Sequence, residues 1–394
     1  MTVLHRSAVR APSPEDDLVG LACGIADRRE AHAPAMRALS RRVDATKLLD
    51  VLERHRLIAL VGTRLDALGS LPVALGGAVE ARLRENRLHA LLHDHVGTQV
   101  LAALEHEGIR ALAFKGFALT EAVHEDPGSR RYEDIDVLVA AGDLAPAVSA
   151  LEPLGYRGRP AGGASELPVL HRLVRDVSGR MPPVELHWRV HWYEREFSAG
   201  MLDRSRASGP RLRATAADEL AALLLIFARD GFRGLRLAVD LAAWWDARGD
   251  ELPPGGLDEL RRRHPELGPV WATALRVAER VTGLPADRAL GDLAPGRRGR
   301  LAFRLSNWPD HETSAQAGAE VSLVDCLLAP RGQVAGTLRR HLFPSSATLD
   351  DFYRLPADAH LRRAAWRVAH PPKLLARYVL GLWRARARWR APAP

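Results

Sequence analysis

The fold class of this chain is indicated by the stretch RRYEDIDVLV at residues 130–139. Polar and apolar residues alternate from residue 134 onward, which predicts a short strand, because successive side chains of a strand point to opposite faces. Asp134 and Asp136 then share one face, about 6–7 Å apart along the strand. Two like charges on one face repel each other and add nothing to a core. The pair therefore indicates a site for hard divalent cations, which prefer oxygen ligands.

A second short apolar run, at residues 109–114, precedes this stretch and ends in Lys115 and Gly116. It predicts a strand and a turn, followed by a short helix. Lys115 is one of only three lysines among 56 basic residues. A lysine ammonium is a compact point charge, whereas a guanidinium is a planar fork. This choice of cation beside a glycine turn makes Lys115 a candidate site residue.

A hairpin is predicted downstream, with arms at residues 169–177 and 184–192 around the turn 178–180. In the second arm, alternation places Glu185 and His187 on its polar face, together with Arg189. If this arm pairs beside the first acidic strand, Glu185 adds a third carboxylate. Three carboxylates that hold two Mg²⁺ ions are suited to in-line transfer of a phosphoryl or nucleotidyl group.

The remaining sequence is helical in its periodicity, before residue 107 and again from residue 216. We therefore predict an α+β fold, in which a small unit of strands and helices is flanked by helical regions. The predicted parts are a flexible tail (1–17), an N-terminal helical region (18–107), the α/β core (108–200) and a C-terminal helical region (201–394). A Gly- and Ala-rich segment at 160–165 is predicted to be a mobile loop.

Arginine alternates with apolar residues near the end of the chain, at 374–389. This pattern predicts a terminal helix that packs by its apolar face and exposes a basic face to solvent. Binding of that helix to a membrane surface or to RNA is the alternative interpretation.

The composition narrows the class of protein further. The chain has 394 residues, 47% of them hydrophobic, and a formal net charge of +8. It has only two cysteines, Cys23 and Cys326, which exclude a metal module built from cysteines. No apolar run approaches the ~18 residues that a membrane span needs, so we predict a cytoplasmic protein. The phosphate-binding loop, the dinucleotide fingerprint and the usual hydrolase motifs are all missing from the sequence.

In their order, these motifs resemble the uncharacterised nucleotidyltransferase family, which belongs to the DNA polymerase β-like nucleotidyltransferase superfamily. The resemblance extends over roughly residues 50–380. It rests on the Lys-Gly turn at 115–116, Arg130, the 134–139 run, Leu-Gly-Tyr at 154–156 and Glu-Leu-His-Trp at 185–188.

The resemblance implies a small mixed-sheet nucleotidyltransferase core and assigns roles to particular residues. Asp134, Asp136 and Glu185 would be the catalytic, metal-binding acids, with Glu185 also acting as general base. Lys115-Gly116 stands where the superfamily has Gly-Ser, so a hydroxyl that contacts the triphosphate is missing. Phosphate or nucleotide contacts are therefore expected from Lys115, Gly116, Arg130 and His187.

The implied activity is Mg²⁺-dependent transfer of a nucleoside monophosphate from a nucleoside triphosphate (NTP), such as ATP, to a hydroxyl or phosphate. Two Mg²⁺ ions are expected, with Mn²⁺ as the alternative. The acceptor is unidentified, and a small molecule, peptide, protein or RNA fits the reaction equally well.

Two other interpretations stay open at this point. The first is a non-catalytic module that keeps the nucleotidyltransferase fold and binds RNA or a partner protein through its basic helices. The second is a glycosyltransferase that binds a sugar-nucleotide diphosphate through Mn²⁺ at the Asp-x-Asp pair. The latter fold needs more strand–helix units before the acidic pair than the single strand predicted here.

Overall fold

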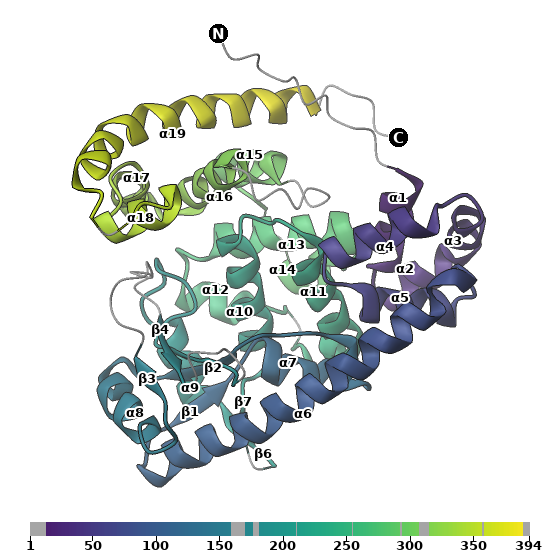
Figure 1. Cartoon of the computed structure of the whole chain (residues 1–394), viewed down its shortest axis with the longest axis horizontal. Coiled ribbons are helices and arrows are strands. Elements are labelled where there is room, and N and C mark those ends of the chain that lie inside the picture. Colours follow the sequence, from purple (N-terminus) through teal and green to yellow (C-terminus); the bar gives the residue numbers. More distant parts are fainter. Residues whose placement is uncertain are drawn as a thin grey trace.

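The structure is a computed structural model that describes residues 13–158, 170–175, 181–209, 211–253, 255–291, 294–306, 315–356 and 358–388. The predicted loop at 160–165 and the turn at 178–180 lie outside the described residues. An α+β architecture is confirmed: one mixed sheet is surrounded by helices that precede and follow it in the chain (Figure 1).

Six α-helices and a short 3₁₀ turn precede the sheet in the described residues. They are α1 (Pro14–Ala22), α2 (Ala26–Ala31), α3 (Ala33–Ser40), α4 (Ala45–Arg54), α5 (Ile58–Ala67), η1 (Val73–Leu75) and α6 (Gly76–His106). Helix α1 begins inside the segment predicted as a tail, because Ser13 and Asp16 cap each other's backbone N–H groups.

The sheet has five strands in the order β1-β2-β5-β4-β3. The strands are β1 (Ala111–Ala113), β2 (Ile135–Val139), β3 (Arg157–Gly158), β4 (Leu170–Val174) and β5 (Val184–His187). Strands β2 and β5 are parallel, and the other neighbours are antiparallel. Between β1 and β3 lie α7 (Gly116–Val123), η2 (Pro127–Ser129), η3 (Ala141–Asp143) and α8 (Leu144–Leu151).

Strand β5 ends sooner than the predicted arm at 184–192. The backbone N–H of Val190 donates to the side chains of Glu194 and Ser198 instead of a neighbouring strand. The chain therefore leaves the sheet after His187, and Arg189 lies outside the strand that was predicted to carry it.

The two faces of the sheet enter different hydrophobic cores. Ile135, Val137 and Val139 pack with residues of α6 and α8. Leu112 and Leu138 belong to the second, larger core, which contains residues from α1 through α19. The helical regions on either side of the sheet thus share one core with it. The domain boundaries stay a prediction.

The helices after the sheet form the rest of the larger core. They are α9 (Phe197–Arg204), α10 (Ala216–Arg229), α11 (Leu235–Arg248), η4 (Gly249–Glu251), α12 (Asp258–Arg263), α13 (Gly268–Thr282), α14 (Ala286–Leu290), α15 (Arg297–Leu305), α16 (Ala315–Leu328), η5 (Arg331–Gln333), α17 (Val334–Leu342), α18 (Ser346–Tyr353) and α19 (His360–Arg388). A small hairpin of β6 (Arg206–Ser208) and β7 (Arg211–Arg213) lies between α9 and α10.

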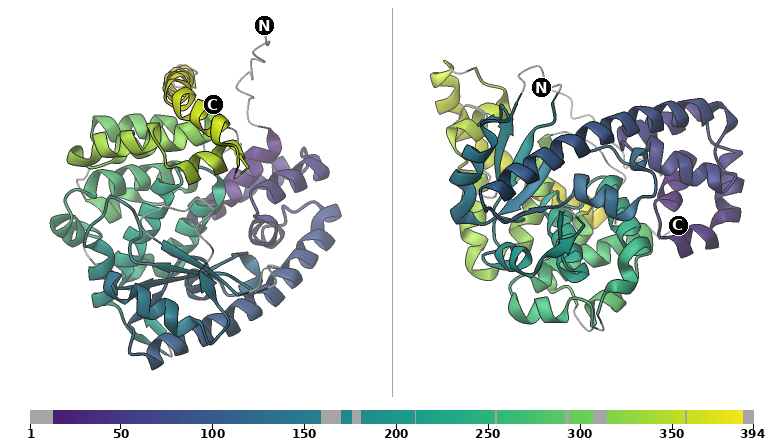
Figure 2. Two further views of the ribbon diagram at one scale, coloured as in Figure 1. Left: turned by 60° about the vertical axis from the view of Figure 1, so that its left-hand side comes forward. Right: turned by 90° about the horizontal axis from the view of Figure 1, so that it is seen from below.

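Helix α19 lies along an outer edge of the molecule, and α15 and α16 separate it from the sheet (Figures 1 and 2). Pro371 and Pro372 lie inside this helix. Among the described residues, no helix combines the length and the apolar composition that crossing a membrane requires.

Candidate functional site

The parallel ladder between β2 and β5 builds an acidic cluster. Asp136 lies directly opposite Glu185 in the register, and His187 follows two residues later on the same face of β5. One ligand atom from each of these three side chains lies within 4.8 Å of the other two. All three residues are buried. In the part of the chain that the structure describes, this is the one group of three potential metal ligands so close together.

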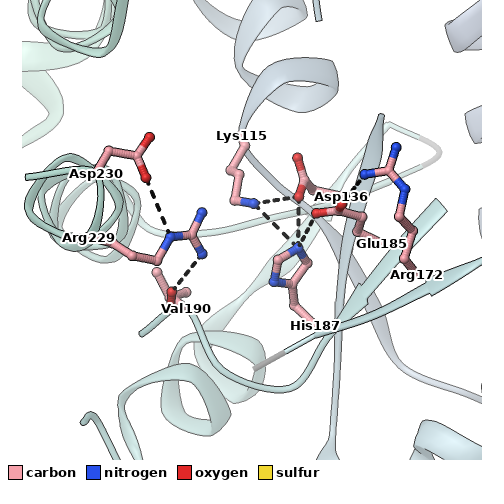
Figure 3. Close-up of polar contacts among 8 residues, drawn as sticks. All are labelled: Lys115, Asp136, Arg172, Glu185, His187, Val190, Arg229 and Asp230. Carbon is pink, nitrogen blue, oxygen red and sulfur yellow. Dashed lines mark hydrogen bonds and ion pairs between the residues drawn. The ribbon is translucent and has the colours of Figure 1, made fainter. Parts of the chain in front are cut away.

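Lys115 reaches the same cluster from the turn between β1 and α7. The backbone N–H of Phe114 donates to the carbonyl oxygen of Asp136, which brings the following lysine beside the carboxylate. The Lys115 Nζ lies 2.5 Å from Asp136 Oδ1 and 3.3 Å from His187 Nε2. The same His187 nitrogen is 2.8 Å from Asp136 Oδ1 (Figure 3). One carboxylate oxygen is therefore shared by a lysine and a histidine.

These contacts determine the charge of the carboxylates. Burial raises the pKa of Asp136, but Lys115 and His187 outweigh it and hold the pKa well below its usual range. Burial likewise opposes ionisation of Glu185, whose pKa is nevertheless lowered, chiefly by its hydrogen bond with His187. Both carboxylates are therefore ionised at neutral pH.

Asp134 behaves differently from the two other acids. It lies immediately before β2 and outside the group of atoms within 4.8 Å. Burial, together with the negative charges of Asp136 and Glu185, raises the pKa of Asp134 to about 6. The structure thus brings Asp136, Glu185 and His187 together and leaves Asp134 at their edge, within electrostatic reach.

Arg130 has a different setting from the one expected of a phosphate ligand. Its Nε and Nη2 donate to Asp240 of α11 at 2.6 and 2.7 Å, and the side chain is only 7% exposed. This buried two-point ion pair joins the segment before β2 to α11. Arg130 thus helps to hold these elements together, and its expected contact with a phosphate stays a prediction.

Gly116 is required by close packing at the first position of α7. A Cβ atom at this position would lie 2.6 Å from the Cβ of Tyr132 and 2.9 Å from the Arg130 guanidinium. Lys115 itself has φ +58° and ψ −139°, a backbone conformation that residues other than glycine rarely adopt. The Lys-Gly turn is thus strained at the lysine and tightly packed at the glycine.

Two arginines that contact β5 or the segment directly after it were missed by the sequence analysis. Arg172 of β4 pairs with Glu185 across the sheet, with 2.7 Å between Nη1 and Oε1. Arg229, at the end of α10, donates to the carbonyl oxygen of Val190, three residues beyond β5 (Figure 3). No sequence motif marks Arg229, because this residue is 90 positions further along the chain than the end of β2.

A cavity of about 210 Å³ opens beside Lys115. Its walls come from β1, α7, β7 and α10, and they are mostly apolar, with Lys115 and Arg211 among the charged lining residues. Lys115, which contacts Asp136, is therefore the residue that links the cluster to this cavity.

Fold and site together define the class: an α+β protein whose mixed sheet carries a buried Asp–Glu–His cluster that could hold a metal ion. A family model described as an uncharacterised nucleotidyltransferase matches residues 41–281, more than half of the chain. The chain therefore belongs to the uncharacterised nucleotidyltransferase family. No curated protein matches the sequence. The buried cluster lies within the matched range and fits a general nucleotidyltransferase.

Proposed function

We propose that the protein is a Mg²⁺-dependent nucleotidyltransferase, which moves a nucleoside monophosphate from an NTP such as ATP to a hydroxyl or phosphate of an acceptor. The observation that carries the proposal is the position of Asp136, Glu185 and His187, whose ligand atoms lie within 4.8 Å of one another on two parallel strands. A small molecule, peptide, protein or RNA could provide the accepting group.

The donors of the cluster fit a divalent cation. Asp136 and Glu185 supply ionised oxygens, and the neighbouring Asp134 has a raised pKa because it is largely buried and lies beside two negative charges. A cation would relieve that repulsion. Asp134, Asp136 and Glu185 would hold Mg²⁺, and the His187 nitrogen also makes Mn²⁺ acceptable. When bound, such ions polarise phosphoryl oxygens and activate the attacking oxygen.

The surrounding cations would act on the substrate and on the acids. The Lys115 ammonium lies beside Asp136, in a position to neutralise phosphate oxygens. Arg130 is the second candidate for this role, since it packs against Gly116 while its ion pair with Asp240 holds it in place. His187 would orient Asp136 as well as contact the nucleotide. The lowered pKa of Glu185 suits metal binding better than proton abstraction.

Neither alternative interpretation gains support from a specific observation. A non-catalytic module needs no buried cluster of acids, because burying carboxylates together opposes folding. A sugar-nucleotide transferase remains an outcome of the binding tests below.

The decisive experiment is nucleotidyl transfer with α-labelled NTPs, Mg²⁺ or Mn²⁺, and an extract that supplies acceptors. Wild-type protein is expected to label a macromolecule or small molecule in the presence of metal and not in EDTA. Asp136→Asn and Glu185→Gln are expected to reduce labelling at least ~100-fold, since lost electrostatic contacts at a reacting centre have effects of this size.

The matched control is Glu133→Gln, which neutralises an exposed acid next to Asp134. It should label acceptors at the wild-type rate. Thermal unfolding of each variant separates loss of chemistry from loss of fold. Undiminished turnover in folded Asp136→Asn would refute the assignment. Calorimetry that shows binding of UDP-sugars with Mn²⁺ but no binding of NTPs would favour the glycosyltransferase. The absence of binding by every nucleotide would favour the non-catalytic module.

A further inference from the structure

Helix α19 has an apolar stripe on its exposed side. Leu361, Val368, Leu375, Val379 and Trp383 are between 46% and 88% exposed. Leu361 and Val368, seven residues apart, share one side of the helix before Pro371 and Pro372. Leu375, Val379 and Trp383 follow at four-residue intervals and share one side of the helix after these prolines. Large apolar side chains are common singly on protein surfaces, but a continuous row of them marks an interaction site.

The stripe is distinct from the face by which α19 packs. Leu374, Tyr378 and Ala385 are buried in the larger core, where α19 meets α15 and α16. Leu374 and Tyr378 each directly precede a stripe residue, which turns them about 100° away from it around the helix axis. The helix therefore has one apolar face that stabilises the fold and a second that is exposed.

The charged side chains of α19 itself are all basic. The sequence of α19 contains arginines and a lysine but no aspartate or glutamate. Lys373 and Arg384 are eleven residues apart after the prolines, which places both on one flank of the stripe. Arg362 and Lys373 are exposed, whereas Arg367 donates to Ser346 of α18. An occupant of this face must therefore combine apolar groups with negative charge.

We propose that α19 docks on an anionic phospholipid surface. The stripe would enter the boundary between headgroups and acyl chains, and the flanking cations would contact lipid phosphates. Trp383 suits this boundary, because its ring is apolar and its N–H is polar. A second copy of the chain fits poorly, since two basic helices without acids repel each other. RNA has the charge but offers no apolar surface to the stripe.

This docking surface is independent of the acidic cluster. Helices α15 and α16 lie between α19 and the sheet (Figure 1). The inference therefore stands apart from the proposed catalytic function, and its failure would leave that function untouched.

The test is flotation of the full-length protein with vesicles of phosphatidylcholine alone and of phosphatidylcholine mixed with phosphatidylglycerol. Wild-type protein is expected to float with the anionic vesicles and to be released as salt is raised. The double variant Val368→Glu/Val379→Glu places acids on the stripe and should bind at least about tenfold more weakly. Its matched control, Val73→Glu, changes a valine that is 98% exposed on η1, and it should bind like wild type.

A second measurement locates the contact on the stripe. Vesicles that contain brominated lipid quench tryptophan fluorescence only at close range, and Trp383→Phe should lose most of that quenching. Equal flotation of wild type and the stripe variant would overturn the proposal. So would failure of wild-type protein to float combined with a stripe-dependent dimer in gel filtration, or with tight binding of RNA that the stripe variant retains.

Discussion

At the scale of single residues, the arrangement of cations decides which acids of the cluster are charged. Lys115 and His187 share an oxygen of Asp136, while Arg172 and His187 lie beside Glu185. Asp134 is partly buried next to both negative charges, and the neighbouring cations do not compensate for them. Its ionised form is therefore destabilising in the metal-free protein, which is typical of a residue kept for function.

We predict that Asp134→Asn stabilises the metal-free protein at pH 7.5 by on the order of 1–2 kcal/mol. The folded-state pKa is raised to about 6 from 3.8, so the folded wild type binds more protons than the unfolded chain between these values. Wild-type stability consequently falls as pH rises through this window, and the advantage of asparagine should be absent near pH 4. Urea unfolding in EDTA at both pH values measures the difference.

The control for this prediction is Glu133→Gln, whose effect on stability should be small at either pH. Added Mg²⁺ should stabilise wild type and have little effect on Asp134→Asn, so that the difference between them shrinks. An Asp134→Asn variant that is no more stable than wild type at pH 7.5 would contradict the pKa argument.

At the scale of elements, the turn from β1 into α7 stores backbone strain at the lysine that contacts Asp136. Conformations of this kind are nearly confined to glycine and persist where the surrounding structure enforces them. The strain and the ion pair act in opposite directions on stability, and substitutions can separate them.

We predict that Lys115→Gly is more stable than Lys115→Ala by about 1 kcal/mol, because only glycine adopts the turn conformation without strain. Both variants lack the ammonium, so both should be equally poor in nucleotidyl transfer. Denaturant unfolding of the two proteins measures the difference. The same pair of substitutions at Glu133, which has no positive φ, should favour alanine. An alanine variant at 115 as stable as the glycine variant would show that the turn relaxes.

The sequence analysis identified most of the elements that build the site. Alternation predicted β2, and the hairpin of β4 and β5 follows from two polar-apolar runs around a glycine. The sequence analysis missed Arg172 because it did not fix the register of the hairpin. A hairpin centred on Gly179 would place Leu173 opposite Glu185, but the observed register places Arg172 there. A shift of one residue moves every side chain to the other face of the sheet.

The partner of Arg130 could not be predicted for another reason. Asp240 lies 110 residues away in the chain, and nothing local links the two side chains. Burial decides the role of Arg130, and burial depends on how α11 packs against α7 and on the segment before β2. Local sequence patterns thus predicted the strands and the acidic residues. Which cations contact the acids depends on packing between residues far apart in the chain.

At the scale of the whole molecule, the Arg130–Asp240 pair joins two parts of the chain that share the larger core. That core takes residues from α1, from the sheet and from the helices up to α19. Because one hydrophobic core contains all these elements, we expect the sheet and the C-terminal helices to unfold cooperatively.

We predict that Arg130→Met and Asp240→Leu each destabilise the protein by about 3 kcal/mol, because each leaves an uncompensated buried charge. The double variant removes both charges and should recover much of the loss. A double-mutant cycle by urea unfolding measures the coupling. The exposed pair Arg56–Glu133 is the control, and its cycle should give less than about 1 kcal/mol. Additive effects at Arg130 and Asp240 would show that the pair does not couple the two parts.

The parallel ladder of β2 and β5 has a consequence for how such a protein can diversify. Asp136 and Glu185 face each other because backbone hydrogen bonds hold their strands at a fixed separation of about 4.8 Å. The main chain of the two strands therefore sets the spacing of the two carboxylates, and the surrounding helices do not. Insertions and exchanges among those helices can reshape the surroundings of the two carboxylates while their spacing stays constant. A lineage could in this way change what reaches the cluster without rebuilding the strands that carry it.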